Sequence, residues 1–127
     1  MTPGVQKAIE QLRAAFPDAE LTIQPDSNGG AYVFVEQIDV GPKFTPRKTW
    51  MGAHLVPQLP YADVYPLFIG GDVTRTDGRP FVAPISPVPF QGRLALQISR
   101  RSNRHDPQAQ SAATKFLKVL HWLEMEA

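Results

Sequence analysis

The chain contains no cysteine in its 127 residues. This absence excludes disulfides, cysteine metal ligands and thiol catalysis in the sequence as it stands. Charge of one sign is also scarce, because 13 Lys and Arg face 12 Asp and Glu and leave a formal net charge of only +1. So small a charge gives no global field that would favour nucleic acid or an acidic membrane as the main partner.

Long hydrophobic runs are missing as well. No apolar stretch approaches the roughly 18 residues that a membrane span requires, and residues 1–12 are amphipathic, without the apolar core of a signal peptide. We therefore expect a cytoplasmic protein with no membrane partner. The length suits a single domain spanning residues 1–127, and 43% hydrophobic with 20% charged residues is a globular balance that argues against disorder.

Proline and glycine are abundant instead, and 13 Pro with 9 Gly predict many turns and few long helices. A first helix is predicted over 2–16, because Thr2 can cap it and Pro3 suits its first turn. Its apolar residues recur at helical spacing: Val5, Ala8, Ile9, Leu12 and Phe16. A last helix is predicted to begin near Asp106–Pro107 and to end near Glu124. Its expected buried stripe is Ala113, Phe116, Leu117, Leu120 and Leu123.

Between the two helices, alternating and β-branched segments predict antiparallel strands. They cover residues 19–24, 31–40, 48–56 and 67–69. Residues 80–89 contain too many prolines to form an interior strand or a helix. The order predicts an α+β fold: an N-terminal helix, a four-stranded antiparallel meander, an irregular proline-rich segment and a C-terminal helix, with the helices on one face.

Short motifs within this order resemble the ubiquitin-conjugating enzymes (UBC fold). That family commonly carries a Tyr-Pro pair at the fourth strand of its meander, and this chain has Tyr65–Pro66. The family also has a stretch of the form Gly-x-Ile-Cys-Leu-x-Ile, whose cysteine carries ubiquitin as a thioester. Residues 92–98 read GRLALQI here, so Ala95 occupies the position of the cysteine.

The sequence departs from the eukaryotic members in two places. Where they have His-Pro-Asn shortly before the cysteine, this chain has Ile85-Ser86-Pro87, and no Trp-Pro follows Ala95. Bacterial conjugating-enzyme-like families often lack His-Pro-Asn. Their basic stretch before the last helix and a Trp-Leu near its end are similar to residues 99–105 and to Trp122–Leu123. The resemblance is therefore to a bacterial variant, for which a role in antiviral defence is implied.

The resemblance implies a carrier that accepts a ubiquitin-like modifier from an activating enzyme and passes it to a protein substrate, without a cofactor. Alanine has no nucleophile, so Ala95 cannot form the thioester. Either Ala95 is an engineered replacement, or the chain is a naturally inactive relative that acts as a scaffold. Asn103 and Ser99 are candidate donors to a developing oxyanion, with ordinary turn-capping roles as the alternative.

Charged side chains suggest where partners would bind. A basic group near Ala95 could guide an acidic partner or the tail of a modifier: Arg93, Arg100, Arg101, Arg104 and His105. By the resemblance, Lys7 and Arg13 on the first helix would dock onto the activating enzyme. No stacking aromatics are interleaved with the arginines, which argues against nucleic acid. The three histidines lie far apart without acidic or cysteine ligands at suitable spacing, so no metal site is expected.

Two interpretations stay open. One is the conjugating carrier; the other is a non-catalytic member of the same fold, or an unrelated α+β domain that binds peptides with its proline-rich segment. The carrier requires Ala95 to lie at the surface, at the edge of a shallow groove beside residues 80–89. Because neighbours in an extended segment alternate faces, we expect Leu94 and Leu96 to point into the core.

Overall fold

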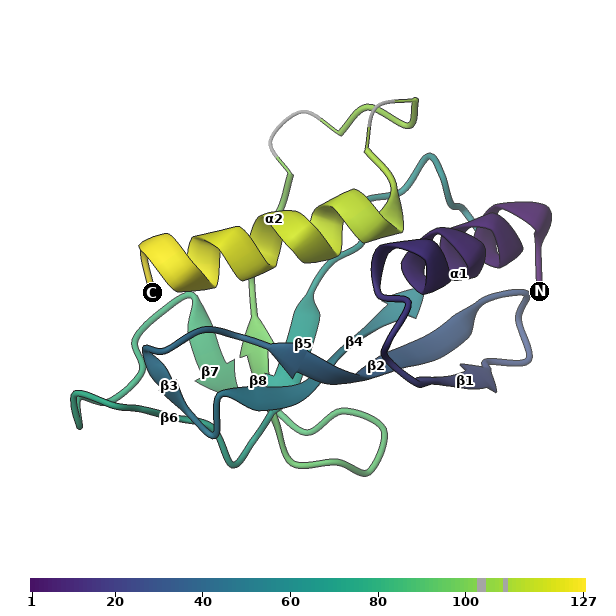
Figure 1. The fold of residues 1–127 in the computed structure, drawn as a ribbon. Helices are drawn as coiled ribbons and strands as arrows, with labels where there is room; N and C mark the ends of the chain where they lie inside the picture. Colours follow the sequence, from purple (N-terminus) through teal and green to yellow (C-terminus); the bar gives the residue numbers. More distant parts are fainter. Residues whose placement is uncertain (103–104, 109) are drawn as a thin grey trace.

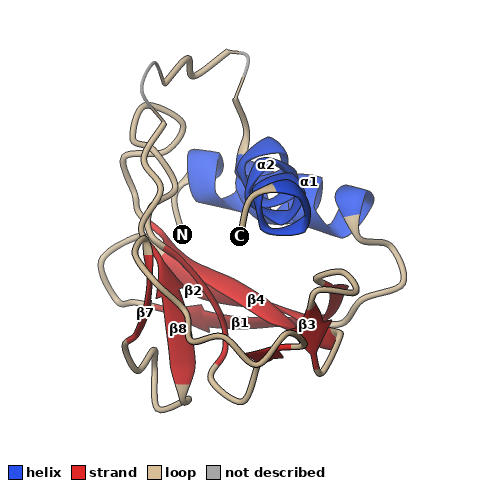
Figure 2. Cartoon of the chain, turned by 90° about the vertical axis from the view of Figure 1, so that its left-hand side faces the viewer, coloured by secondary structure: helices blue, strands red, loops and turns tan. Residues whose placement is uncertain are grey.

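A computed structural model describes residues 1–102, 105–108 and 110–127 of the chain. Two helices, α1 (Pro3–Ala15) and α2 (Ala112–Met125), lie on one face of a six-stranded sheet (Figures 1 and 2). Every neighbouring pair of strands in this sheet is antiparallel. The predicted α+β class, with both helices on the same face, is confirmed.

The sheet runs in the order β1-β2-β4-β5-β8-β7, and β3 and β6 pair in a separate two-stranded sheet. The strands are β1 (Leu21–Pro25), β2 (Ala31–Asp39), β3 (Phe44–Thr45), β4 (Lys48–Leu55), β5 (Leu67–Gly70), β6 (Thr74–Arg75), β7 (Ile85–Pro87) and β8 (Ala95–Ile98). The four predicted strands correspond to β1, β2, β4 and β5. The prediction of only four was wrong, because β8 and β7 extend the sheet beyond β5.

Helix α1 follows from purely local signals. The Thr2 hydroxyl accepts a hydrogen bond from the Val5 N–H at 3.3 Å, and Pro3 is the first helical residue. The apolar stripe turns toward the sheet and is buried at Val5, Ala8, Ile9 and Leu12. Capping, proline placement and hydrophobic periodicity all agree here, which is why the prediction is confirmed.

Helix α2 begins later than predicted, at Ala112, with Ser111 as its N-cap. Asp106 instead closes a single turn: its carboxylate accepts from the Gln108 N–H at 2.9 Å and its carbonyl from the Gln110 N–H at 2.8 Å. A side chain bonded to the backbone two residues on is an Asx turn, which competes with helix formation. The capping residue Asp106 and the proline after it therefore mark a turn and not the start of the helix.

The buried stripe of α2 also differs from the prediction at two positions, since Leu120 is only half-buried and Leu117 is exposed. Leu117 is 48% exposed, whereas Phe116 beside it is fully buried. Successive helical residues lie about 100° apart around the axis, so both cannot face the sheet equally. Lys115 and Val119 are buried in addition.

The sheet separates two hydrophobic clusters. The larger lies between the sheet and the helices and includes Phe116. The smaller lies on the opposite, outer face and is made of Phe34, Phe68, Phe90 and Ala95. The rings of Phe68 and Phe90 stack at a centroid distance of 4.1 Å. Both faces of the central strands are therefore covered by apolar side chains.

Strand β7 occupies one edge of the sheet and pairs only with β8. Proline lacks a backbone donor and is tolerated at an edge, so the expectation that residues 80–89 form no interior strand is confirmed. Among the described residues, neither helix is long and apolar enough to cross a membrane.

The exposure difference on α2 predicts unequal costs of truncation. Phe116→Ala should lower the free energy of unfolding by about 3–5 kcal/mol, because it leaves a cavity between the helix and the sheet. Leu117→Ala, the adjacent control, should cost less than about 1 kcal/mol, because much of that side chain is in water. Urea unfolding at neutral pH measures both, and equal costs would contradict the placement of α2.

Candidate functional site

Ala95 does not lie at an exposed site. Its side chain is 4% exposed and belongs to the outer aromatic cluster. Its backbone is held on both sides, since Ala95 is the register partner of Gly70 and its carbonyl accepts from the Val88 N–H at 3.1 Å. The expectation of a groove-edge position was wrong, because the segment joins the sheet as β8 and residues 88–90 cover its outer face.

The two neighbours of Ala95 differ in exposure, whereas both were expected to point into the core. Leu96 is buried between sheet and helices, as expected, but Leu94 is 81% exposed. Leu94 lies between β8 and a tight turn at Gln91 and Gly92, which both have positive φ. The Leu94 side chain thus lies outside the hydrogen-bonded strand. The alternation of side chains between the two faces of the sheet starts only at Ala95.

Arg93 holds this turn against the outer face. Its guanidinium donates two hydrogen bonds of 2.8 Å to the carboxylate of Glu36 on β2 and lies 3.9 Å from the ring centroid of Phe34. The Thr22 hydroxyl also donates to Glu36. The bonds from Arg93 in particular hold the pKa of Glu36 below its usual range, although partial burial opposes them. Arg93 therefore has a structural partner already.

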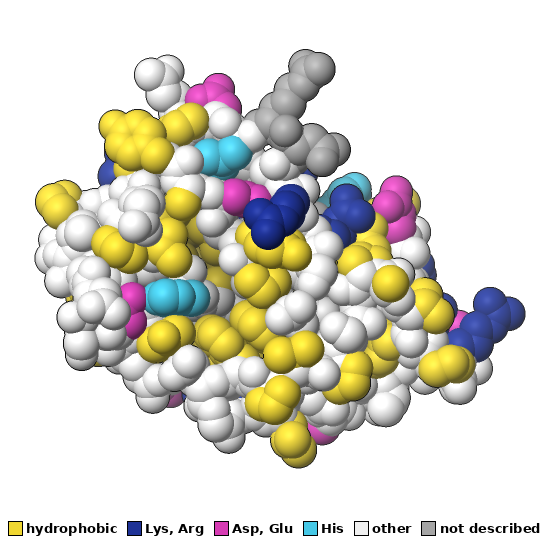
Figure 3. Space-filling model, turned by 180° about the vertical axis from the view of Figure 1, so that it is seen from behind, with side chains coloured by type: hydrophobic (Ala, Val, Ile, Leu, Met, Phe, Trp, Pro, Cys, Tyr) yellow, Lys and Arg dark blue, Asp and Glu magenta, His cyan; other side chains and the backbone are white. Residues whose placement is uncertain are grey.

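Among the described residues, Arg100 and Arg101 lie over different aromatic rings from those that Arg93 contacts. The Arg100 guanidinium lies over the ring of Trp122 on α2 at 4.7 Å, and that of Arg101 lies over Tyr65 at 4.0 Å. Seen from behind in Figure 3, basic side chains are divided by hydrophobic and polar surface. The Ser99 hydroxyl accepts from the side chain of Gln97 at 2.9 Å. Asn103 and Arg104 lie outside the described residues.

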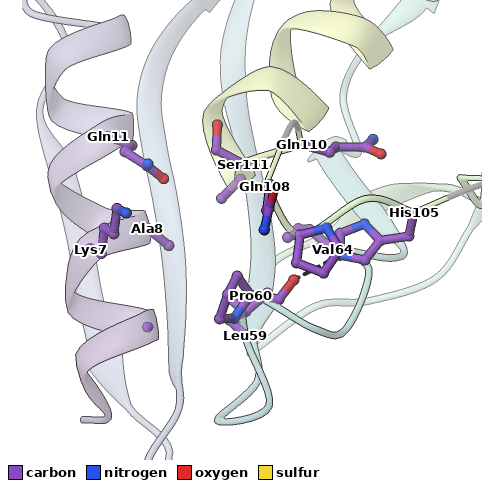
Figure 4. A pocket seen from close by; sticks show the side chains of 13 residues that line it. Lys7, Ala8, Gln11, Leu59, Pro60, Val64, His105, Gln108, Gln110 and Ser111 are labelled. Carbon is purple, nitrogen blue, oxygen red and sulfur yellow. Dashed lines mark hydrogen bonds between the residues drawn. The ribbon is translucent and has the colours of Figure 1, made fainter.

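A groove of about 550 Å³ lies where α1 meets the N-terminal end of α2 (Figure 4). Its described lining residues come from α1, from residues 59–64 and from residues 105–112: Gly4, Lys7, Ala8, Gln11, Leu59, Pro60, Val64, His105, Pro107, Gln108, Gln110, Ser111 and Ala112. Of the predicted site residues, Lys7 lies in this lining and Arg13 does not. His105, assigned to the basic group, lies here too.

The wall formed by α1 depends on a glycine. A Cβ atom at Gly4 would lie 2.1 Å from the Leu59 carbonyl oxygen, so only glycine lets residues 59–60 approach the helix this closely. Figure 4 shows Lys7, Ala8 and Gln11 following one another along α1, with Pro60 and Gln108 across the groove.

The opposite wall is tied together by side chains. His105 Nε2 donates to the Pro60 carbonyl at 2.8 Å, which places a proton on that nitrogen. His105 Nδ1 is buried without a hydrogen-bond partner among the described residues. Gln110 donates to the Ser102 hydroxyl at 2.8 Å. One bond thus joins residue 105 to residue 60, and the other joins residue 110 to residue 102.

A buried lysine, Lys115, holds the chain next to this wall in place. Lys115 is 3% exposed, and its Nζ lies 3.2 Å from Asp63 Oδ2, 3.0 Å from Ser102 Oγ and 2.8 Å from the Arg100 carbonyl. Burial would raise the pKa of Asp63, but bonds from Ser102 and Lys115 outweigh it and the pKa is lowered. Burial lowers the pKa of Lys115. The pair fixes residues 63 and 102 to α2.

The lining combines hydrogen-bond donors with apolar side chains. The Ser111 hydroxyl caps α2 by accepting from the Thr114 N–H at 3.1 Å. Lys7, Gln11 and Gln108 offer donors above an apolar floor. Sequence reasoning missed both glutamines, because only the fold brings residues 11 and 108 to one groove.

Comparisons with known proteins identify no family for this chain. No family model, curated protein or solved structure matches this chain.

The Glu36–Arg93 pair generates a prediction about pH. A carboxylate whose folded-state pKa is lowered stabilises the fold above its unfolded pKa, and this contribution is lost as the pH falls through the folded value. Glu36→Gln should cost about 1 kcal/mol at pH 7, because it weakens a bidentate charged pair. It should also flatten the decline of stability between about pH 5 and pH 2. Urea unfolding across this range measures both effects. Glu10→Gln, an exposed site on α1, is the control, and identical slopes for wild type and Glu36→Gln would contradict the assignment.

The burial of Ala95 is tested by two single-cysteine variants, since the chain has no other thiol. Leu94→Cys should react with a water-soluble disulfide reagent at the rate of a free thiol. Ala95→Cys should react on the order of 100-fold more slowly, because a buried thiol is shielded and resists ionisation. The rates are measured under native conditions and again in urea, where they should converge. Equal native rates would show that β8 leaves the sheet readily.

Proposed function

We propose that this protein is a non-catalytic binding domain that holds a segment of a protein partner in the groove between α1 and the start of α2. The observation that supports this most directly is the contrast between two places. The groove is open and offers donors from Lys7, Gln11 and Gln108, whereas Ala95, the position expected to carry chemistry, is 4% exposed. A carrier must present its reactive atom to two partners, and a binding domain has no such requirement.

The relation to conjugating enzymes enters the proposal in its inactive form. An N-terminal helix, an antiparallel sheet and a late helix on the same face of that sheet support the UBC-like scaffold interpretation, although the sheet has six strands where four were expected. An activating enzyme or a ubiquitin-like modifier is then a candidate source of the bound segment. The carrier interpretation at Ala95 would require β8 to separate from both β5 and β7, which the cysteine rates test.

The groove has the features of a recognition site. Binding sites combine a mostly apolar surface with a few placed polar groups, and here the floor is formed by Ala8, Leu59 and Pro60. Tyr61, next to Pro60, is 78% exposed. Tyrosine is a common anchor at protein interfaces. In this proposal the contributing proline-rich segment is residues 57–64, in place of residues 80–89.

The test uses dodecapeptides selected from a random display library on the immobilised protein. Their affinity is measured in solution by fluorescence anisotropy. Gln11→Trp fills the groove without changing its charge and should weaken binding by at least about tenfold, because the ligand is excluded sterically. Gln6→Trp is the matched control, since Gln6 is exposed on the same helix and outside the lining. Equal affinities for the two variants would overturn the proposed function.

A further inference from the structure

We propose that the segment bound in the groove is acidic, with an aspartate or glutamate side chain facing Lys7 and an apolar residue beside it. This inference rests on the proposed function and names the chemistry of its ligand. It commits to a peptide segment of a protein partner as the occupant.

The charge of the groove points to an acid. None of its thirteen described lining residues is Asp or Glu, and Lys7 is exposed on one wall. Lys7 forms no ion pair among the described residues, whereas Lys115 and Arg93 are both paired. A lysine without a partner, in a groove that contains no carboxylate, complements an anionic side chain.

The acidic residues close in sequence to the lining residues are already hydrogen-bonded or lie outside the lining. Asp63 is bonded to Lys115 and Ser102, and Asp106 accepts the Gln108 N–H. Glu10 lies one turn along α1 but does not line the groove. None of these carboxylates is within ion-pair distance of Lys7 in the described part of the chain.

The polar groups on the two walls allow one carboxylate to be held from both sides. Lys7 and Gln11 approach from α1, and Gln108 lies across the groove in Figure 4. A carboxylate accepts several hydrogen bonds at once, so it suits an ammonium and two amides. The apolar side chains of the lining, Leu59 and Pro60 among them, then contact the neighbouring residue of the ligand.

The experiment compares two charge reversals on α1. Peptides selected on the wild-type protein should be enriched in Asp and Glu over the starting library. Lys7→Glu should weaken their binding by about tenfold or more, because attraction is replaced by repulsion. Arg13→Glu changes the net charge of the same helix equally but lies outside the lining, and should change affinity by less than about threefold. Raising the salt concentration should reduce the difference in peptide affinity between the two variants.

Two results would overturn the inference, and they separate it from the proposed function. Peptides that are blocked by Gln11→Trp but show no acidic enrichment would leave the groove as a binding site and refute the acidic ligand. Equal losses for Lys7→Glu and Arg13→Glu would refute the contact at Lys7 in the same way. Peptides insensitive to Gln11→Trp would remove both proposals together. Circular dichroism of each variant verifies that the fold is retained.

Discussion

The insertion of β8 between β5 and β7 determines how the outer face of the sheet is covered. This insertion depends on a glycine, where no side chain prevents two backbone segments from approaching each other. Gly71 follows β5 directly, and a Cβ atom there would lie 2.6 Å from the Leu94 carbonyl carbon. Only glycine therefore lets the chain before β8 approach. Once β8 is in place, Phe90 stacks on Phe68 and Arg93 reaches Glu36. The enclosure of Ala95 is a consequence of this packing, not an independent feature.

On the helix side, the groove depends on a buried ion pair. Removing an ammonium from water costs several kcal/mol unless its donors are satisfied, and Lys115 meets this condition with Asp63, Ser102 and the Arg100 carbonyl. The same bonds fix the chain around residues 63 and 102 relative to α2. Walls that are already ordered lose less conformational entropy when a ligand binds. The buried ion pair thus holds residue 63, next to the lining residue Val64, against α2.

The sequence predictions succeeded where the interactions involved join residues close together in the sequence, and they failed where the interactions join distant segments. Helix α1 was predictable because Thr2, Pro3 and the apolar stripe act within a few residues of one another. Strand β7 was not, because the prolines around it argued against an interior strand or a helix, and its partner β8 follows a turn. Ala95 was misplaced for a related reason: alternation predicts which neighbours share a face, but not which face another segment will cover. Lys7 was singled out through the family resemblance, while nothing local connects Gln11 with Gln108.

The two interpretations left open by the sequence make opposite demands on the structure. A carrier needs freedom at position 95, so that a modifier tail and an amine can both reach one atom. A binding domain needs rigidity where its ligand lies. In this fold the backbone of Ala95 is bonded on both sides and its side chain is enclosed by aromatic rings. The groove, in contrast, is open yet supported by Gly4, His105 and Lys115. The segment that a carrier would have to free is thus held in the sheet, and the segments that line the groove are held in place, which is the physical basis of the binding function proposed above.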